Sequence, residues 1–218
     1  MMLAAELDTL RHQAARRFVT GVAVLTVWHG ETAHGTTVSS VTTLSKVPLL
    51  IGASLRSGSA FTEVVSTAGR FALNVLSGRQ VALAGWFARP ERPHGLAQFD
   101  HLDWEPDAFS GAPWIDGSLA SVGCRVTAVI PVGDHDLILA EVITARANHG
   151  APLLHFAGRL HEGMLRALSR DETHPFSGQA AARRPAPVSS PVNSRMNSPL
   201  NSPVNSRMNT EREDSSWD

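Results

Sequence analysis

Hydroxyl groups are concentrated in one short segment of the chain, the run HGTTVSSVTTLSKVP at positions 34–48. Serine and threonine hydroxyls and backbone N–H groups offer many hydrogen-bond donors without a negative charge, which suits a phosphate or the polar edge of a heterocycle. The residues that we take as candidates for such contacts are Gly35, Thr36, Thr37, Ser39 and Ser40. The same composition also fits an edge strand whose threonines reflect β-propensity alone.

A second hydroxyl-rich run, SLRSGSAF, occupies positions 54–61 and precedes a short helical pattern. Free N–H groups at a helix start, together with Ser57 and Ser59, make a general anion site. Either serine also suits a plain N-cap, which needs no ligand. The two hydroxyl-rich runs flank one apolar run, PLLIGASL, which reads as a buried strand. Together they favour a ligand site more strongly than either does alone.

The third candidate is His135, in the run PVGDHDLILAEV at positions 131–142. The apolar residues 137–140 indicate a buried strand, so the preceding Gly-Asp-His-Asp run is either a simple hairpin corner or a strand end that holds His135 toward a ligand. In the second case, Asp134 or Asp136 orients the imidazole by accepting one ring proton.

The sequence lacks the motifs of several other common binding and catalytic sites. The sequence has no dinucleotide-binding GxGxxG, no P-loop, no GxSxG nucleophile elbow and no HExxH zinc helix. The runs DHLD (100–103) and GDHD (133–136) offer oxygen and nitrogen ligands, but such pairs are common in exposed loops, so we predict no metal site. The single cysteine, Cys124, lies in a strand-like run and indicates a buried thiol, with neither an intramolecular disulfide nor a cysteine-based zinc site.

The elements that must position these residues are mostly strands. An amphipathic helix is expected at the N-terminus, because apolar residues recur there at three- and four-residue steps between Leu3 and Phe18. Short helices are expected near 59–69 and 79–88, and an irregular proline-rich crossing at 89–113. Later strands are expected at 118–131, 136–146 and 152–157. Helices are too few for a doubly wound parallel sheet, so we predict a mainly β fold with peripheral helices, a closed or partly closed antiparallel barrel.

Composition narrows the class of protein. The net charge is −1 and no basic patch stands out, which argues against nucleic acid as a partner. The N-terminus lacks the apolar core of a signal peptide and no apolar stretch is long enough to cross a membrane, so a cytoplasmic location without membrane attachment is the default expectation. Residues 1–170 are expected to form one domain. Residues 171–218, in which SPVNSRMN occurs twice, are expected to be a disordered low-complexity tail.

The order of the pieces resembles that of the flavin reductase-like family over residues 11 to about 163. The pieces are RFVTGVAVLTV, GTTVSSVTTLSKVPLL, SGSAF, GRFALNVLSGRQVALAGWFA, GSLASVGCRV, GDHDLILAEV and PLLHFAGRL. The resemblance implies the FMN-binding split β-barrel, a Greek-key antiparallel barrel. It also implies the small reductase component of a two-component flavin-dependent monooxygenase, and a homodimer.

The resemblance also assigns roles. The segment 35–40 would line the flavin ring, with Ala53, Ser54 and Leu55 continuing that wall, and Ser57 or Ser59 would reach the flavin phosphate. Trp86 and Phe87 would close the far side, although members of the family often have arginine at the position of Trp86. His135 would contact the nicotinamide, and His155, Phe156, Ala157 and Gly158 would complete the NAD(P)H site. Leu160 stands where the family usually has an aromatic residue.

The function expected from these residues is hydride transfer from NADH or NADPH to FMN or FAD, followed by diffusion of the reduced flavin to a partner monooxygenase. A wall of hydroxyl donors without carboxylates suits the alignment of two planar rings, since the cofactors carry the chemistry themselves. One alternative is a split-barrel module that retains its flavin, and another is a non-enzymatic barrel in a larger assembly. The GDH and HFAG pieces favour the reductase, because a pure flavin binder needs no nicotinamide site.

Overall fold

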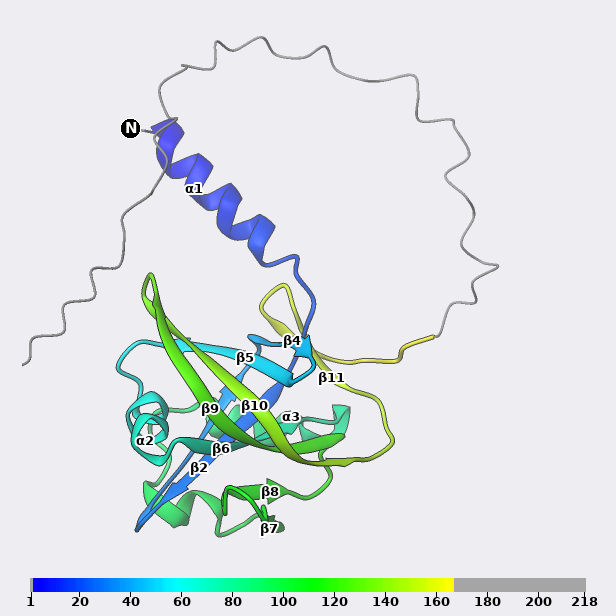
Figure 1. Ribbon diagram of the computed structural model, residues 1–218. Helices are drawn as coiled ribbons and strands as arrows, with labels where there is room; N and C mark the ends of the chain where they lie inside the picture. Colours follow the sequence, from blue (N-terminus) through cyan, green and yellow to red (C-terminus); the bar gives the residue numbers. More distant parts are fainter. Residues whose placement is uncertain (1, 167–218) are drawn as a thin grey trace, which may run out of the picture. The chain divides into compact units, whose positions relative to one another are not determined.

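The computed structural model describes residues 2–166 of the chain, and the expected tail at 171–218 lies outside the described residues (Figure 1). Helix α1 (Met2–Ala15) opens the chain, as the apolar spacing predicts, and its side chains from Glu6 onward are exposed. No helix among the described residues is long and apolar enough to cross a membrane.

The largest sheet among the described residues is antiparallel and has seven strands in the order β3-β2-β6-β9-β10-β5-β4. In chain order its members are β2 (Ala23–His29), β3 (Thr32–Val38), β4 (Val41–Lys46), β5 (Leu49–Arg56), β6 (Arg70–Val75), β9 (Ala120–Val132) and β10 (His135–Ala147). The last two fall close to the expected limits, because both combine a long β-branched pattern with a clear turn signal between them.

The two edges of this sheet, β3 and β4, are consecutive in the chain and are joined only by Ser39 and Ser40. The sheet therefore curls so that its two edge strands come close together at this link. Next to this link, Ser40 extends the pairing of β4 with β5: Ser54 of β5 donates its N–H to the carbonyl of Ser40 at 3.2 Å, and the Ser40 hydroxyl donates to the carbonyl of Ser54 at 2.6 Å. This closure confirms the prediction of a mainly β antiparallel barrel with peripheral helices.

Two apolar clusters pack on opposite faces of the sheet, because strand side chains alternate between faces. Leu25 of β2 belongs to the inner cluster with Phe61 of α2 (Ala60–Ala68), whereas Val24 belongs to the outer cluster. The outer cluster also contains residues of α3 (Val81–Ala88) and of the short helix η2 (Gly95–Phe99), which lies in the crossing expected to be irregular. Helix α3 is therefore held against the outside of the barrel wall.

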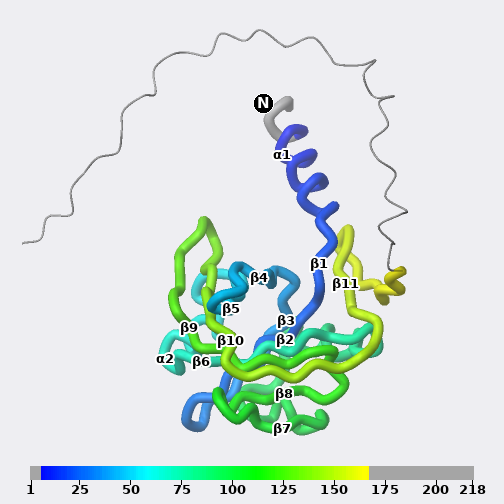
Figure 2. The backbone as a smooth tube through the Cα atoms, turned by 45° about the vertical axis from the view of Figure 1, so that its right-hand side comes forward, coloured from blue at the N-terminus to red at the C-terminus, as the bar shows by residue number. Residues whose placement is uncertain are grey.

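The remaining elements are short. Strands β1 (Thr20–Gly21), β11 (Leu153–Phe156) and β12 (Arg159–Glu162) form a small sheet, and β7 (Trp104–Pro106) pairs with β8 (Pro113–Ile115). The helical turn η1 (Gly78–Gln80) leads into α3. Figure 2 shows the long β9–β10 hairpin standing beside β5 and β4, so its turn reaches the same end of the sheet as the loop after β5.

Candidate functional site

The first part of the predicted site lies where the barrel closes. The structure brings Ser40 against Ser54 through two hydrogen bonds, and β4 pairs with β5 so that Val41 faces Ala53. Hence the hydroxyl-rich run 35–40 and the run 53–55, predicted as two parts of one wall, are neighbours in space. Residues 32–46 contain no carboxylate, so donors dominate this part of the surface. This donor set fits the polar edge of a flavin.

His135 is the first residue of β10 and lies opposite Arg56 of β5. It follows the turn Gly133–Asp134, in which Gly133 has φ +63°, a conformation that glycine adopts without strain. The hairpin interpretation of this run is therefore correct for the backbone. The same hairpin places the imidazole one strand away from the wall at 53–55.

The imidazole of His135 is held by its neighbour. His135 Nδ1 lies 2.8 Å from Asp134 Oδ1, and the hydrogen bond to His135 is the main reason why the pKa of Asp134 lies below its ordinary value. Since an ionised carboxylate only accepts hydrogen bonds, Nδ1 carries the proton and Nε2 of the neutral ring is left as an acceptor. Asp136 has a different partner, because it accepts from the Ser57 hydroxyl at 3.0 Å.

The loop after β5 is tied to the hairpin on one side and caps α2 on the other. Ser57 donates its N–H to the carbonyl of Asp134 at 3.1 Å. Ser59 is the N-cap of α2, where its hydroxyl accepts from the N–H of Thr62 at 3.2 Å. The capping alternative for Ser59 is thus the observed one. The hydroxyls of both serines have protein partners, and their contact with a phosphate stays a prediction.

Two predicted site residues lie at the contact between β3 and α3: the Thr37 side chain points toward α3, and Phe87, a residue of α3, packs against β3. The Thr37 hydroxyl donates to the carbonyl of Ala84 at 2.8 Å, and Phe87 is only 1% exposed. A Cβ added to Gly35 would lie 2.4 Å from Cε1 of Phe87, so the ring packs directly beneath that glycine. By strand alternation Thr36 faces the opposite side, with Val38 of the inner cluster. Phe87 therefore supports the wall from behind instead of closing the site with its own surface.

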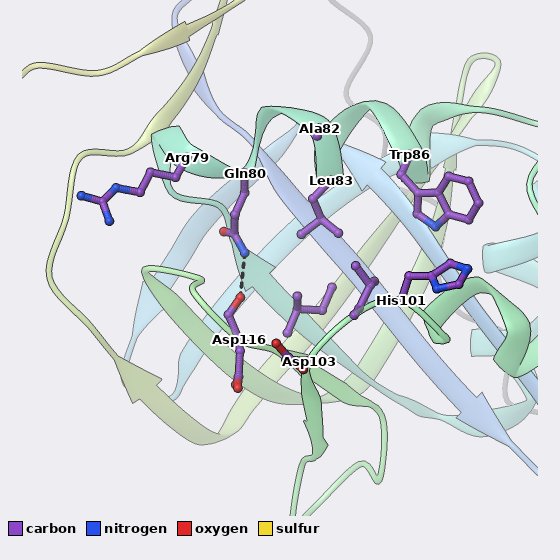
Figure 3. Close-up of a pocket in the computed structure, with 10 residues that line it drawn as sticks. Arg79, Gln80, Ala82, Leu83, Trp86, His101, Asp103 and Asp116 are labelled. Atoms are coloured by element: carbon purple, nitrogen blue, oxygen red, sulfur yellow. Dashed lines mark hydrogen bonds between the residues drawn. The ribbon is translucent and has the colours of Figure 1, made fainter.

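Trp86 lies on the other face of α3, at the rim of a cavity of about 460 Å³ (Figure 3). The cavity combines apolar groups such as Leu83 with polar ones such as Arg79 and Asp116, and the side chain of Gln80 bridges it by donating to the carbonyl of Asp116 at 2.9 Å. Trp86 is the only predicted site residue among its lining residues. Its indole N–H donates to the carbonyl of Gln98 at 2.9 Å.

The run His155–Gly158 belongs to the small sheet. His155 pairs with Thr20 of β1, and the N–H of Ala157 donates to the carbonyl of Arg16 at 3.1 Å. Phe156 lies under the guanidinium of Arg17, with 6.0 Å from Cζ to the ring centroid. These contacts attach the hairpin to the segment after α1. That the run His155–Gly158 contacts the nicotinamide stays a prediction.

The sequence interpretation missed three residues beside the wall, namely His34, Arg92 and Gln98. Gln98 is 2% exposed and bonds the backbone of β3, and Arg92 bonds both Gln98 and His34. Two of the three lie in the crossing at 89–113, which shows no periodic pattern. Among residues 2–166, no group of three His, Cys, Asp or Glu side chains gathers where it could hold a metal ion.

The chain is similar to known proteins over most of its described residues. The model of the flavin reductase-like domain matches residues 15–164. An NADPH-flavin oxidoreductase of Streptomyces viridifaciens is 49% identical over 156 residues, 71% of this chain and 80% of that protein. An NADH-dependent FMN reductase of Streptomyces nodosus is 40% identical over 142 residues, 64% of this chain and 76% of that protein.

Solved structures show the same fold. The flavin reductase component of a bacterial two-component tryptophan halogenase is 29% identical with a TM-score of 0.68, covering 73% of this chain and 99% of that one. The NADH:FAD oxidoreductase of Streptomyces globisporus is 32% identical with a TM-score of 0.66, covering 71% and 92%. The match extends through the barrel, the closing wall and the hairpin that carries His135, so the chain belongs to the flavin reductase-like family and is an NAD(P)H-dependent flavin reductase.

Proposed function

We propose that the enzyme reduces FMN or FAD at the closing wall of the barrel, takes the hydride from a nicotinamide held at His135, and releases the reduced flavin to a partner monooxygenase. The observation that carries this proposal is the juxtaposition of the runs 35–40 and 53–55 with the His135 hairpin on adjacent strands. When bound, the two cofactors supply hydride transfer, and the protein has to align their rings.

Each part of the wall then has a task. Backbone N–H groups and hydroxyls around Ser39 and Ser40 hold the polar edge of the flavin, and the absence of carboxylates between 32 and 46 favours an anionic reduced ring there. Thr36 contributes its hydroxyl to flavin binding from the inner face of β3. Ser57 or Ser59 reaches the flavin phosphate in this proposal, the first by exchanging its hydrogen bond to Asp136 and the second from the N-terminal cap of α2.

His135 positions the nicotinamide and is not required as an acid or base. Asp134 keeps the proton on Nδ1, so Nε2 can accept a hydrogen bond from the carboxamide N–H of a nicotinamide. The side chain is 41% exposed, which leaves it accessible from the hairpin end. The hairpin His155–Gly158 completes the nicotinamide site in this proposal, as the family resemblance implies.

Release of the flavin and pairing of subunits are part of the same proposal. The solved halogenase component belongs to a two-component system, and a relative from Rhodococcus opacus is the reductase component of a monooxygenase, which supports transfer of reduced flavin to a separate enzyme. Large apolar side chains are exposed on β4, in the turn after it and near the end of the β9–β10 hairpin, among them Leu44, Val47 and Val132. Such a surface favours a homodimer, and a roughly 23 kDa species alone in sedimentation would contradict it.

The activity is tested by following nicotinamide oxidation with NADH or NADPH and free FMN or FAD, in all four combinations. The relatives cited above use different donors, so the preferred pair is an outcome of this assay. Ultrafiltration after turnover separates the two functional alternatives. We expect reduced flavin in the filtrate, whereas flavin that stays with the protein would favour the retaining module.

His135→Ala tests the nicotinamide assignment. Loss of one hydrogen bond of roughly 1–3 kcal/mol should lower kcat/KM for the nicotinamide about five- to a hundredfold and leave the flavin KM nearly unchanged. His29→Ala is the control, since His29 is an exposed histidine at the end of β2. A variant that keeps full kcat/KM, or that loses flavin instead, would contradict the assignment.

Thr36→Val tests the flavin assignment separately. It removes one hydroxyl and keeps the β-branched shape, so the expected effect is a higher flavin KM with an unchanged nicotinamide KM. Thr32→Val, at the exposed start of the same strand, is the control. An unchanged flavin KM in Thr36→Val and in Ser39→Ala would place the flavin elsewhere.

A further inference from the structure

Strand β3 is an edge of the main sheet, and a bare edge leaves backbone groups without strand partners. In an antiparallel pair, the N–H and carbonyl of one residue point to the same side, and successive residues alternate. The outward-facing residues of β3 are therefore Ala33, Gly35 and Thr37. Ala33 and Gly35 receive side-chain partners, and Thr37 lies within the run 35–40 of the wall proposed for the flavin.

Gln98 of η2 takes the place of a neighbouring strand at Ala33 and Gly35. Its Nε2 donates to the carbonyl of Ala33 at 3.0 Å, and its Oε1 accepts from the N–H of Gly35 at 3.2 Å. The same Nε2 also donates to the carbonyl of Gly95 at 3.0 Å, which closes the η2 turn. The amide is buried and its hydrogen-bonding capacity is used on both atoms, so the register between η2 and β3 is tightly specified.

Arg92 joins this arrangement from the loop before η2. Its Nε donates to Oε1 of Gln98 at 2.9 Å, its Nη1 to the carbonyl of Arg89, and its Nη2 to the carbonyl of Gly35. Nη2 also lies 3.0 Å from Nε2 of His34, and because a guanidinium has no acceptor, that histidine nitrogen accepts. A planar fork of donors matches such a set of acceptors, whereas an ammonium does not.

His34, which accepts a hydrogen bond from Arg92, is a neutral partner of the guanidinium. Burial is the main cause that lowers the pKa of His34 to about 4, with Arg92 and His94 adding to it, so the ring is neutral near pH 7 and accepts the hydrogen bond. Cζ of Arg92 lies 5.9 Å from the centroid of Phe87, the ring packed beneath Gly35. Gly35 is therefore held by Arg92 at its carbonyl, by Gln98 at its N–H and by the packed ring of Phe87.

We propose that Arg92 and Gln98 are positioning residues for flavin reduction, which fix the backbone of β3 at Gly35 so that the adjoining run 36–40 is aligned with the flavin. This inference rests on the proposed flavin wall. Neither side chain needs to touch a cofactor, because both act through the strand. A displaced wall should weaken flavin binding and leave the nicotinamide contact at the His135 hairpin intact, since that hairpin pairs with β5 and β9 and not with β3.

The test is steady-state kinetics of Arg92→Ala, Arg92→Lys and Gln98→Glu. We expect the flavin KM to rise about tenfold in Arg92→Ala, since small misplacements of a binding wall have effects of this order or larger. The nicotinamide KM and kcat at saturating flavin should stay within about twofold. Arg92→Lys should recover only part of the loss, because one ammonium cannot serve four acceptors in fixed directions.

Gln98→Glu changes one NH₂ to oxygen and keeps the side-chain shape. It preserves the bonds from Gly35 and Arg92 but places a carboxylate oxygen against the carbonyls of Ala33 and Gly95, so it should raise the flavin KM as well. Arg89→Ala is the matched control, since its exposed side chain lies in the same loop and its hydrogen bonds use only its backbone N–H and carbonyl, which the substitution keeps. Melting temperatures of all variants separate loss of folded protein from loss of alignment.

A flavin KM that stays unchanged in both Arg92→Ala and Gln98→Glu, with a lower melting temperature, would overturn the inference and leave the pair a structural contact. Equal increases in flavin and nicotinamide KM would also overturn it. If Thr36→Val raises the flavin KM while the Arg92 and Gln98 variants do not, the wall stands and the positioning role fails. If none of them changes the flavin KM, the wall itself is misassigned.

Discussion

The contact between Gly35 and Phe87 makes a direct prediction about stability. Gly35 lies in extended strand β3, so alanine suits its backbone, yet the added Cβ would lie 2.4 Å from Cε1 and 2.7 Å from Cδ1 of Phe87. The ring cannot easily move away, because it is 1% exposed and packs 5.3 Å from the ring of Phe99, centroid to centroid. Gly35→Ala should therefore overpack the outer cluster.

Overpacking of this kind costs typically about 1–3 kcal/mol, and the lower entropy of the unfolded chain with alanine offsets roughly 0.5 kcal/mol of that. For a domain of this size, about 2–4 °C is lost per kcal/mol, so the melting temperature should fall by roughly 1–10 °C. Differential scanning calorimetry with and without saturating FMN measures both the stability and the ability of the altered wall to bind flavin.

Gly85→Ala is the matched control within α3. Nothing lies within 4 Å of a Cβ at that helical position, so alanine should stabilise the protein by roughly 0.5–1 kcal/mol. A smaller side chain at position 87 should relieve the clash, so Phe87→Leu should cost less in the Gly35→Ala background than in the wild type. Equal melting temperatures for Gly35→Ala and wild type, or strict additivity in the double variant, would refute this reasoning.

Three further predictions follow from other parts of the chain. The pKa of His34 is lowered from 6.5 to about 4, mainly by burial and then by Arg92 and His94, so the unfolded chain binds more protons between these values and stability is lost as pH falls from 6.5 toward 4. After allowance for partial exposure we expect a loss of about 1–2 kcal/mol in urea unfolding at pH 4.5 relative to pH 7, and a smaller loss in His34→Gln. Burial, and secondarily Asp107, raises the pKa of the Cys124 thiol to about 12, so a disulfide reagent at pH 8 should label it only in denaturant, and rapid labelling of the native protein would contradict its burial. The family match ends at residue 164, so a chain truncated before Ser177 should keep its reductase rate, and a loss above about tenfold would assign the tail a role in the enzyme.

Local patterns in the sequence determined much of the fold. The β-branched runs, the Gly-Asp turn before His135 and the glycine after α2 each act through neighbouring residues, and the strands and caps appear where these signals predict them. The order of the hydroxyl-rich and GDHD runs was also sufficient to suggest the family. Those residues lie in strands and turns that short sequence patterns specify.

Only the tertiary structure decided which side of β3 each wall residue faces and what holds that strand in place. Thr37, predicted as a site residue, turns toward α3, because the alternation of β3 sends odd-numbered side chains into the outer cluster. Phe87, another predicted site residue, lies on α3 and packs beneath Gly35 in the same cluster. Gln98 and Arg92 carry no motif and lie more than fifty residues after the backbone groups of β3 that they bond. Their partners are set by chain crossings and by the need to satisfy buried polar groups, which no local pattern encodes.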